Sequence, residues 1–185
     1  MGKFVFGIIV GFALVFGAVY VYFTYGFAPV ATNAAPMPLE KKFANAALHA
    51  RINKEMPKDV PLPVDEPNMV AGAQVYKQNC AVCHGLPGQE QTPIAKGMFP
   101  KPPKLTEGTG VTDDPAQETF WKVQNGIRMT GMPGFQSTLT TQQMWQVSIM
   151  LANADKLPAA AKNELTAPIP APPQPPPTTP KPIHK

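Results

Sequence analysis

The 185-residue sequence is poor in cysteine and in charge, and it lacks the motifs of several common enzyme classes. Its two cysteines are too few for a disulfide-rich scaffold. Only 15% of the residues are charged, and the net charge of +4 is spread along the chain, which does not favour a nucleic-acid-binding protein. There is no G-x-G-x-x-G, no P-loop and no H-E-x-x-H, so the usual signs of nucleotide binding and of zinc peptidase chemistry are missing.

Proline, by contrast, is abundant, with 24 residues that interrupt the chain in three places. Clusters at 57–67 and 93–103 exclude long continuous helices there. A third begins at Pro168, and residues 167–182 read APIPAPPQPPPTTPKP. Such a segment favours the polyproline II conformation and cannot form a packed core. We therefore expect a disordered proline-rich tail over residues 161–185.

The N-terminal segment has 22 consecutive residues without charge, from Phe4 to Tyr25. As a helix it is about 33 Å long, enough to cross a bilayer core of about 30 Å. The rival interpretation is a cleaved signal peptide, but its apolar stretch is usually shorter, roughly 7–15 residues. We expect an uncleaved transmembrane anchor over 1–28. Gly7 and Gly11 form a G-x-x-x-G pattern that favours contact with a second membrane helix, although ordinary membrane-helix glycines explain it equally well.

The rest of the chain reads as helices joined by loops, and no stretch is typical of a strand. Apolar residues recur at helical spacing over 39–55. Asn68 is a candidate cap for a helix that leads into the two cysteines. Asp114 and Pro115 have the pattern of a cap followed by a first-turn proline. Thr140-x-x-Gln143 is a capping box that opens a helix through about residue 154. The predicted class is all-α, with an anchor at 1–28, a linker with a short amphipathic helix at 29–67, a folded domain at 68–160 and the tail.

The chemistry of the chain is indicated by Cys80-Ala81-Val82-Cys83-His84, the C-x-x-C-H pattern of covalent haem attachment. Two thiols on one helical turn can bond to the two vinyl groups of a porphyrin, and the adjacent imidazole of His84 can bind the iron from below. A redox C-x-x-C prefers the start of a helix after a strand, a zinc site needs four ligands, and a disulfide across two residues is strained. The pattern therefore predicts one covalent haem c at Cys80 and Cys83, with His84 as an axial ligand to the iron.

The second axial ligand must come from elsewhere in the chain. Met144 and Met150 lie on a helix face that is better explained by core packing. Met132 lies in NGIRMTGMPGF after a predicted helix, where Gly131 lets the backbone approach the haem ring and Pro133 fixes the turn. A thioether suits the iron and favours its reduced state. These features favour Met132, and they leave three alternatives open: Met129, Met98 and His49.

The predicted haem also bears on location, since covalent haem attachment is completed outside the bacterial cytoplasm. The chain after Tyr25 is thus expected on the periplasmic side of the bacterial inner membrane, as a single-pass protein. The absence of further cysteines fits that oxidising compartment.

About half of the chain, residues 68–158, resembles a class I c-type cytochrome domain of the membrane-anchored bacterial single-haem kind. Four motifs carry the resemblance in order: CAVCH at 80–84, GMFPKPP at 97–103, NGIRMTGMP at 125–133 and WQVSIMLANADKLP at 145–158. The resemblance implies an all-α fold in which the first and last helices cross, with Gly72 and Tyr76 meeting Trp145 and Ile149. It also implies that Met132 is the distal ligand and that a proline carbonyl within 100–103 accepts a hydrogen bond from His84.

An iron with six ligands has no open site for a substrate, so the expected function is one-electron transfer rather than catalysis. We expect a carrier between membrane redox complexes, or a subunit of one, with a quinol-oxidising complex, a terminal oxidase or a reaction centre as partner. A haem-based gas sensor or haem enzyme subunit with a labile distal ligand is the alternative, and a structural tether is a weaker one. Six basic residues either form a rim that steers acidic partners or are scattered surface charges: Lys77, Lys96, Lys101, Lys104, Lys122 and Arg128.

Overall fold

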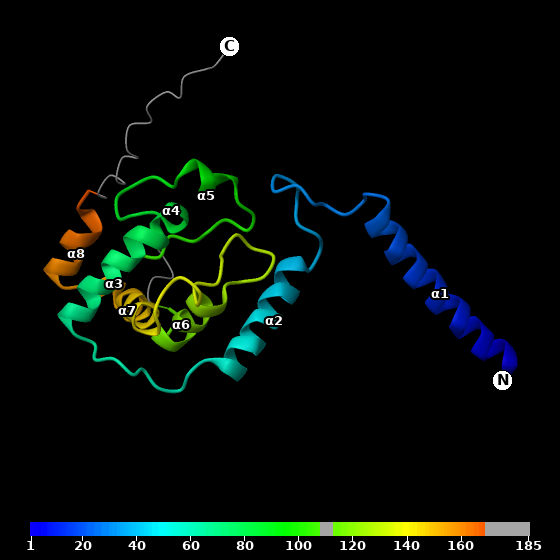
Figure 1. Ribbon diagram of the computed structural model, residues 1–185. Coiled ribbons are helices and arrows are strands. Elements are labelled where there is room, and N and C mark those ends of the chain that lie inside the picture. Colours follow the sequence, from blue (N-terminus) through cyan, green and yellow to red (C-terminus); the bar gives the residue numbers. More distant parts are fainter. Residues whose placement is uncertain (108–112, 169–185) are drawn as a thin grey trace, which may run out of the picture.

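The structure, a computed structural model, describes residues 1–107 and 113–168, and these contain helices but no strands (Figure 1). The elements in chain order are α1 (Gly2–Thr24), α2 (Glu40–Glu55), α3 (Glu66–Asn79), α4 (Ala81–His84), α5 (Pro93–Gly97), α6 (Ala116–Asn125), α7 (Thr141–Ala152), the 3-10 turn η1 (Ala154–Lys156) and α8 (Ala159–Thr166). The all-α prediction is confirmed. Most of the expected proline-rich tail lies outside the described residues.

The helix α1 is the one described element that is long and apolar enough to cross a membrane. None of its residues is buried against the rest of the chain. Figure 1 shows it projecting away from the other helices, joined to them through residues 25–39. Its length and composition are consistent with the single-pass anchor expected from the sequence.

The core is built where α3 and α7 cross, with α6 and α8 packed around them (Figure 1). Tyr76 on α3 and Val147 and Met150 on α7 are fully buried at this crossing. The rings of Phe120 on α6 and Trp145 on α7 stack with centroids 4.1 Å apart. The first and last helices of the cytochrome-like segment therefore cross, as the sequence resemblance implied.

The close approach of α3 and α7 depends on Gly72. A Cβ atom on Gly72 would lie 2.7 Å from the carbonyl carbon of Gln146 and 2.8 Å from the Cβ of Met150, with the Gln146 oxygen nearer still. The expected partners of this crossing were Trp145 and Ile149. The atoms nearest to Gly72 belong to the residues that follow these two, Gln146 and Met150, and Trp145 and Ile149 are themselves buried.

The helix ends follow local capping chemistry, with two differences from expectation. Thr140 and Gln143 form the predicted capping box at the start of α7. The helix α3 begins at Glu66, before Asn68, because the Asp65 carboxylate accepts from the Asn68 amide at 3.0 Å and Pro67 fits the first turn. At α6, Pro115 rather than Asp114 is the cap residue, and it makes no side-chain capping bond.

Two further elements extend the folded part beyond the expected boundaries. The expected boundary between domain and tail falls inside α8, whose Ala161 and Leu165 are buried against α3. Lys77 on α3 and Glu164 on α8 form an ion pair at 3.0 Å. On the other side of the domain, α2 packs on α6 through Ile52, which is fully buried.

Candidate functional site

The C-x-x-C-H motif lies at the junction of α3 and α4. Cys80 ends α3 and caps α4, and His84 is the last residue of α4. The amides of Cys83 and His84 both donate to the Cys80 carbonyl, at 3.1 and 2.9 Å, so one tight turn presents both thiols and the imidazole. The buried Tyr76 hydroxyl donates to the Gly85 carbonyl at 2.8 Å and fastens the end of this turn to α3.

The two cysteines are not joined by a disulfide, and both line one cavity. Burial, and after it the neighbouring Cys83, raises the pKa of the Cys80 thiol to about 12. The Cys80 sulfur is therefore uncharged at neutral pH. A thioether is also uncharged, so this apolar position suits a sulfur that is bonded to a porphyrin side chain.

The imidazole of His84 is held by a single hydrogen bond to the loop that follows α5. Its Nδ1 lies 2.8 Å from the Pro103 carbonyl oxygen. Because a carbonyl can only accept, Nδ1 carries the hydrogen, and the lone pair of Nε2 is left for a metal. Burial lowers the pKa of His84, and the hydrogen bond to Pro103 offsets this only in part. The neutral imidazole, which is the form that binds iron, is thus favoured.

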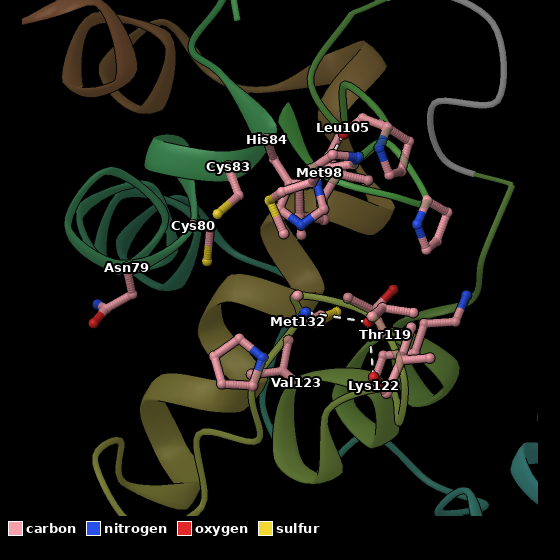
Figure 2. Close-up of a pocket in the computed structure, with 18 of the residues that line it drawn as sticks. Asn79, Cys80, Cys83, His84, Met98, Leu105, Thr119, Lys122, Val123 and Met132 are labelled. Atoms are coloured by element: carbon pink, nitrogen blue, oxygen red, sulfur yellow. Dashed lines mark hydrogen bonds between the residues drawn. The ribbon is translucent and has the colours of Figure 1, made fainter. Parts of the chain in front are cut away.

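The cavity beside these residues has a volume of about 240 Å³ and is walled mainly by apolar side chains. His84 lies on one side of it and Met132, Val123 and Thr119 lie on the other (Figure 2). The end of the Met98 side chain reaches Gly131, next to Met132. Ile127, Phe135, Leu105 and prolines of the 100–103 segment complete the wall. A mainly apolar cavity with two thiols at one end, and with an imidazole and a thioether on facing sides, fits a covalently bound haem.

The alternatives for the second axial ligand are separated by their positions. Met132 and Met98 both line the cavity. Met129 does not, because its side chain is 92% exposed to solvent and its backbone has φ of 60°. His49 lies on α2, where its Nδ1 is 3.9 Å from a Glu118 carboxylate oxygen, and it does not line the cavity. Met144 and Met150 are buried on α7, as core packing predicts.

The loop that carries Met132 is tied to the end of α6. The Met132 carbonyl accepts from the Ile127 amide at 3.2 Å, and its amide donates to the Thr130 hydroxyl at 3.1 Å. Gly126 makes the turn possible, because its φ is 68° and a Cβ there would lie 2.5 Å from the Gly134 nitrogen. At Gly131, an added Cβ would overlap the end of the Met98 side chain, so this backbone runs directly beside the second cavity methionine.

A charged cluster that the sequence reasoning missed borders the cavity on the α6 side. Lys122 lines the cavity, and its ammonium lies 2.6 Å from Asp114 and 2.9 Å from Glu118. Burial by itself lowers the pKa of Lys122, but the two carboxylates more than reverse this, so the net pKa is raised. Oε1 of Glu118 is buried, and among the described residues its close polar neighbour is the Lys122 ammonium, with which it forms an ion pair. The i, i+4 spacing of Glu118 and Lys122 on a helix is the sequence pattern that predicts their ion pair.

Most of the expected basic rim is neutralised. Four of its six members form ion pairs: Lys77 with Glu164, Lys96 with Glu90, Lys104 with Glu107, and Lys122 with Asp114 and Glu118. Lys77 is also buried. This arrangement favours scattered surface charges over a continuous basic rim.

Two comparisons with known proteins found a match. Residues 67–149 match the family described as cytochrome c oxidase, cbb3-type, subunit III. Among solved structures, the chain is similar to one from the reducing HAO-like protein complex of Kuenenia stuttgartiensis, with 26% sequence identity and a TM-score of 0.44. That match covers 54% of this chain and 50% of the other, so it spans about half the length of each. No curated protein matches the chain.

Proposed function

The chain is a c-type cytochrome, and on that premise we propose that it transfers single electrons through one haem bound to Cys80 and Cys83, with His84 and Met132 as axial ligands. The observation that carries the proposal is the cavity between α3, α6 and the loop at 126–135. It has both thiols at one end, and the free imidazole nitrogen of His84 and the thioether of Met132 on facing sides (Figure 2).

The bound haem supplies an iron that gains or loses one electron. The residues of the chain set the conditions for that exchange. The Pro103 carbonyl orients the His84 ring and makes its nitrogen a stronger donor. The sulfur of Met132 favours the reduced over the oxidised metal. The cavity walls are mainly apolar, and an iron held by Met132 as well as His84 would have no open place for a substrate. Electron transfer is therefore favoured over catalysis.

We place this cytochrome in the bacterial inner membrane as a single-pass protein, with α1 as the anchor and the domain on the periplasmic side. The length and apolar character of α1 support the anchor. The periplasmic side is supported by the C-x-x-C-H motif, since covalent haem attachment is completed outside the cytoplasm. Its partners are then membrane redox complexes, and it acts as a carrier between them or as a subunit of one.

The ligand assignment is tested with three single variants of the holoprotein. Met132→Ala is expected to abolish the sulfur-to-iron charge-transfer absorption of the oxidised protein and to lower its reduction potential. Met129→Ala is the matched control, because Met129 is fully exposed in the same loop, and the absorption band is expected to survive. If Met98→Ala removes the band and Met132→Ala leaves it, the assignment to Met132 is wrong.

The attachment sites are tested by denaturing electrophoresis with haem staining. Replacing both Cys80 and Cys83 by Ala is expected to leave no haem on the chain. Retained stain would refute these two residues as the attachment sites.

A second candidate function has one observation in its favour. Met98 lies in the same cavity, beside the backbone of the Met132 loop. A second sulfur there suits a haem protein whose distal ligand is exchanged, such as a gas sensor or a haem enzyme subunit. Carbon monoxide distinguishes the two functions: rapid and complete binding to the reduced protein would support the exchange, and slow or partial binding supports electron transfer.

A further inference from the structure

The helix α2 lies outside the segment that matches the cytochrome family, yet one of its faces is firmly attached to the domain. Ile52 is fully buried against α6. The indole nitrogen of Trp121 on α6 donates to the Glu55 carboxylate at 3.3 Å. The Gln117 side chain donates to the Lys58 carbonyl at 3.3 Å, just after the helix ends. The orientation of α2 on the domain is therefore defined, and with it the direction in which the opposite face points.

The opposite face of α2 is an exposed apolar stripe. Phe43 precedes Ile52 by nine positions, which at about 100° per residue places it half a turn away. Its side chain is 67% exposed, and that of Leu39 is 59% exposed. The other members of the stripe are exposed alanines at helical spacing. We call the following set the outer face of α2: Phe43, Ala46, Ala47 and Ala50 of the helix, together with Leu39, the cap residue just before it.

Basic residues flank the outer face. Lys42 lies about 100° to one side of Phe43, and Lys54 lies close to the end of the stripe. Arg51 lies about 80° to the other side, but it forms an ion pair with Glu55 at 2.6 Å. The other acidic residue of the helix, Glu40, accepts from the Met37 amide at 2.8 Å. Basic side chains beside exposed apolar ones attract a surface of anionic lipid headgroups.

The short connection between α1 and α2 keeps α2 near the membrane surface. The helix α1 ends at Thr24 and α2 begins at Glu40, so residues 25–39 are the whole connection. At full extension this connection reaches about 50 Å, and as a flexible coil about 20 Å. Phe27 and Val30 within it are also exposed. Figure 1 shows α2 at the edge of the domain on the side where this connection leads to α1. A short tether gives α2 a high local concentration at the bilayer that holds α1.

We propose that the outer face of α2 rests on the surface of the bilayer, with its basic flanks against anionic lipid headgroups. The proposal rests on the transmembrane role of α1 stated above. Because α2 is fixed to α6, and Thr119, Lys122 and Val123 of α6 line the haem cavity, this contact holds the cavity in one orientation to the membrane. The domain then presents the haem to partners embedded in the same bilayer.

The test uses the full-length holoprotein in nanodiscs of phosphatidylcholine containing phosphatidylglycerol. A nitroxide is attached at Ala47→Cys, and the haem is kept reduced so that low-spin iron does not broaden the signal. The natural cysteines are expected to be blocked by the haem. The matched control label is at Lys162→Cys, an exposed position on α8. Collision with a water-soluble nickel complex is expected to be at least about twofold weaker at position 47 than at 162. It is expected to recover in nanodiscs of phosphatidylcholine alone.

A second variant tests the apolar contact between α2 and the bilayer. Replacing Leu39 and Phe43 by Ser removes the apolar contact without disturbing a buried position, and it is expected to expose the label at 47. Equal nickel accessibility at 47 and 162 in protein that stays in the nanodiscs would overturn the α2 contact alone. Loss of the protein from the nanodiscs would refute the α1 anchor and the α2 contact together. Shielding that persists in detergent, with spin–spin broadening as labelling increases, would show a second copy on this face and would also overturn the proposal.

Discussion

Replacing Gly72 by Ala is expected to destabilise the domain severely, because the new methyl group has no room at the crossing of α3 and α7. It would lie 2.7 Å from the Gln146 carbonyl carbon and 2.8 Å from the Met150 Cβ, and closer still to the Gln146 oxygen. These are backbone atoms and the first side-chain atom, so no rotamer change relieves the overlap. The two helices must separate by about 1 Å, and the contacts between them weaken along the whole crossing.

The magnitude follows from two opposing contributions. Overpacking of a core costs about 1–3 kcal/mol and occasionally more, and because backbone atoms block this site we take about 4 kcal/mol. Alanine in a helix is about 1 kcal/mol better than glycine, which leaves a net loss of about 3 kcal/mol. That is a large part of the roughly 5–15 kcal/mol that stabilises a typical domain. For a domain of this size it lowers the melting temperature by about 15 °C.

The measurement is thermal unfolding of the holoprotein, followed by far-ultraviolet circular dichroism. Gly97→Ala is the matched control, because Gly97 is also helical and a Cβ there meets nothing within 4 Å. Its effect should stay within about 0.5 kcal/mol. If Gly72→Ala lowers the melting temperature no more than Gly97→Ala does, the close approach of α3 and α7 described above is wrong.

Three further changes test other parts of the structure. Ile52→Ala should lower the free energy of unfolding by about 3 kcal/mol, because Ile52 is fully buried between α2 and α6; a loss below about 0.5 kcal/mol in urea denaturation would show that α2 is not part of the folded domain. Thr140→Ala should cost about 1 kcal/mol in the same assay through loss of the capping box of α7, whereas an unchanged midpoint would contradict that role. Lys122→Met tests the ion pairs of Lys122 with Asp114 and Glu118. The pKa of Lys122 is raised above its ordinary value of 10.5. The stability that the charged amine contributes is therefore fully present below pH 10.5 and is lost as the pH rises through the raised pKa of the folded protein. The difference in unfolding free energy between wild type and variant should therefore be constant at neutral pH and shrink only in strong alkali, and a difference that already shrinks near neutral pH would refute the pairing with Asp114 and Glu118.

Much of the local structure is predictable because its causes are close together in the chain. The helix at 39–55 and the capping box of Thr140 and Gln143 follow from spacing, and the structure confirms both. Taking Asn68 as the cap places the start of α3 three residues too late. The capping carboxylate belongs to Asp65. Propensity alone does not choose between two capping residues three positions apart.

The candidate haem site also combines features that follow from the local sequence with features that depend on the fold. The C-x-x-C-H turn places Cys80, Cys83 and His84 by itself, and the His84 contact with a proline carbonyl was expected from the family resemblance and is present at Pro103. The position of Met98 beside Gly131 was not foreseen, because the loops that carry them meet only through the fold. The pairing of Lys77 with Glu164, 87 positions apart, likewise has no local signal.

By itself, the sequence determined the helical class, the apolar N-terminal helix and the chemistry of the haem-attachment motif, since each depends on residues within one or a few helical turns of one another. Only the tertiary structure decided which methionines reach the cavity, which lysines are neutralised and where α2 and α8 pack. Those outcomes depend on side chains far apart in the chain, and they are selected by packing and burial rather than by any local preference.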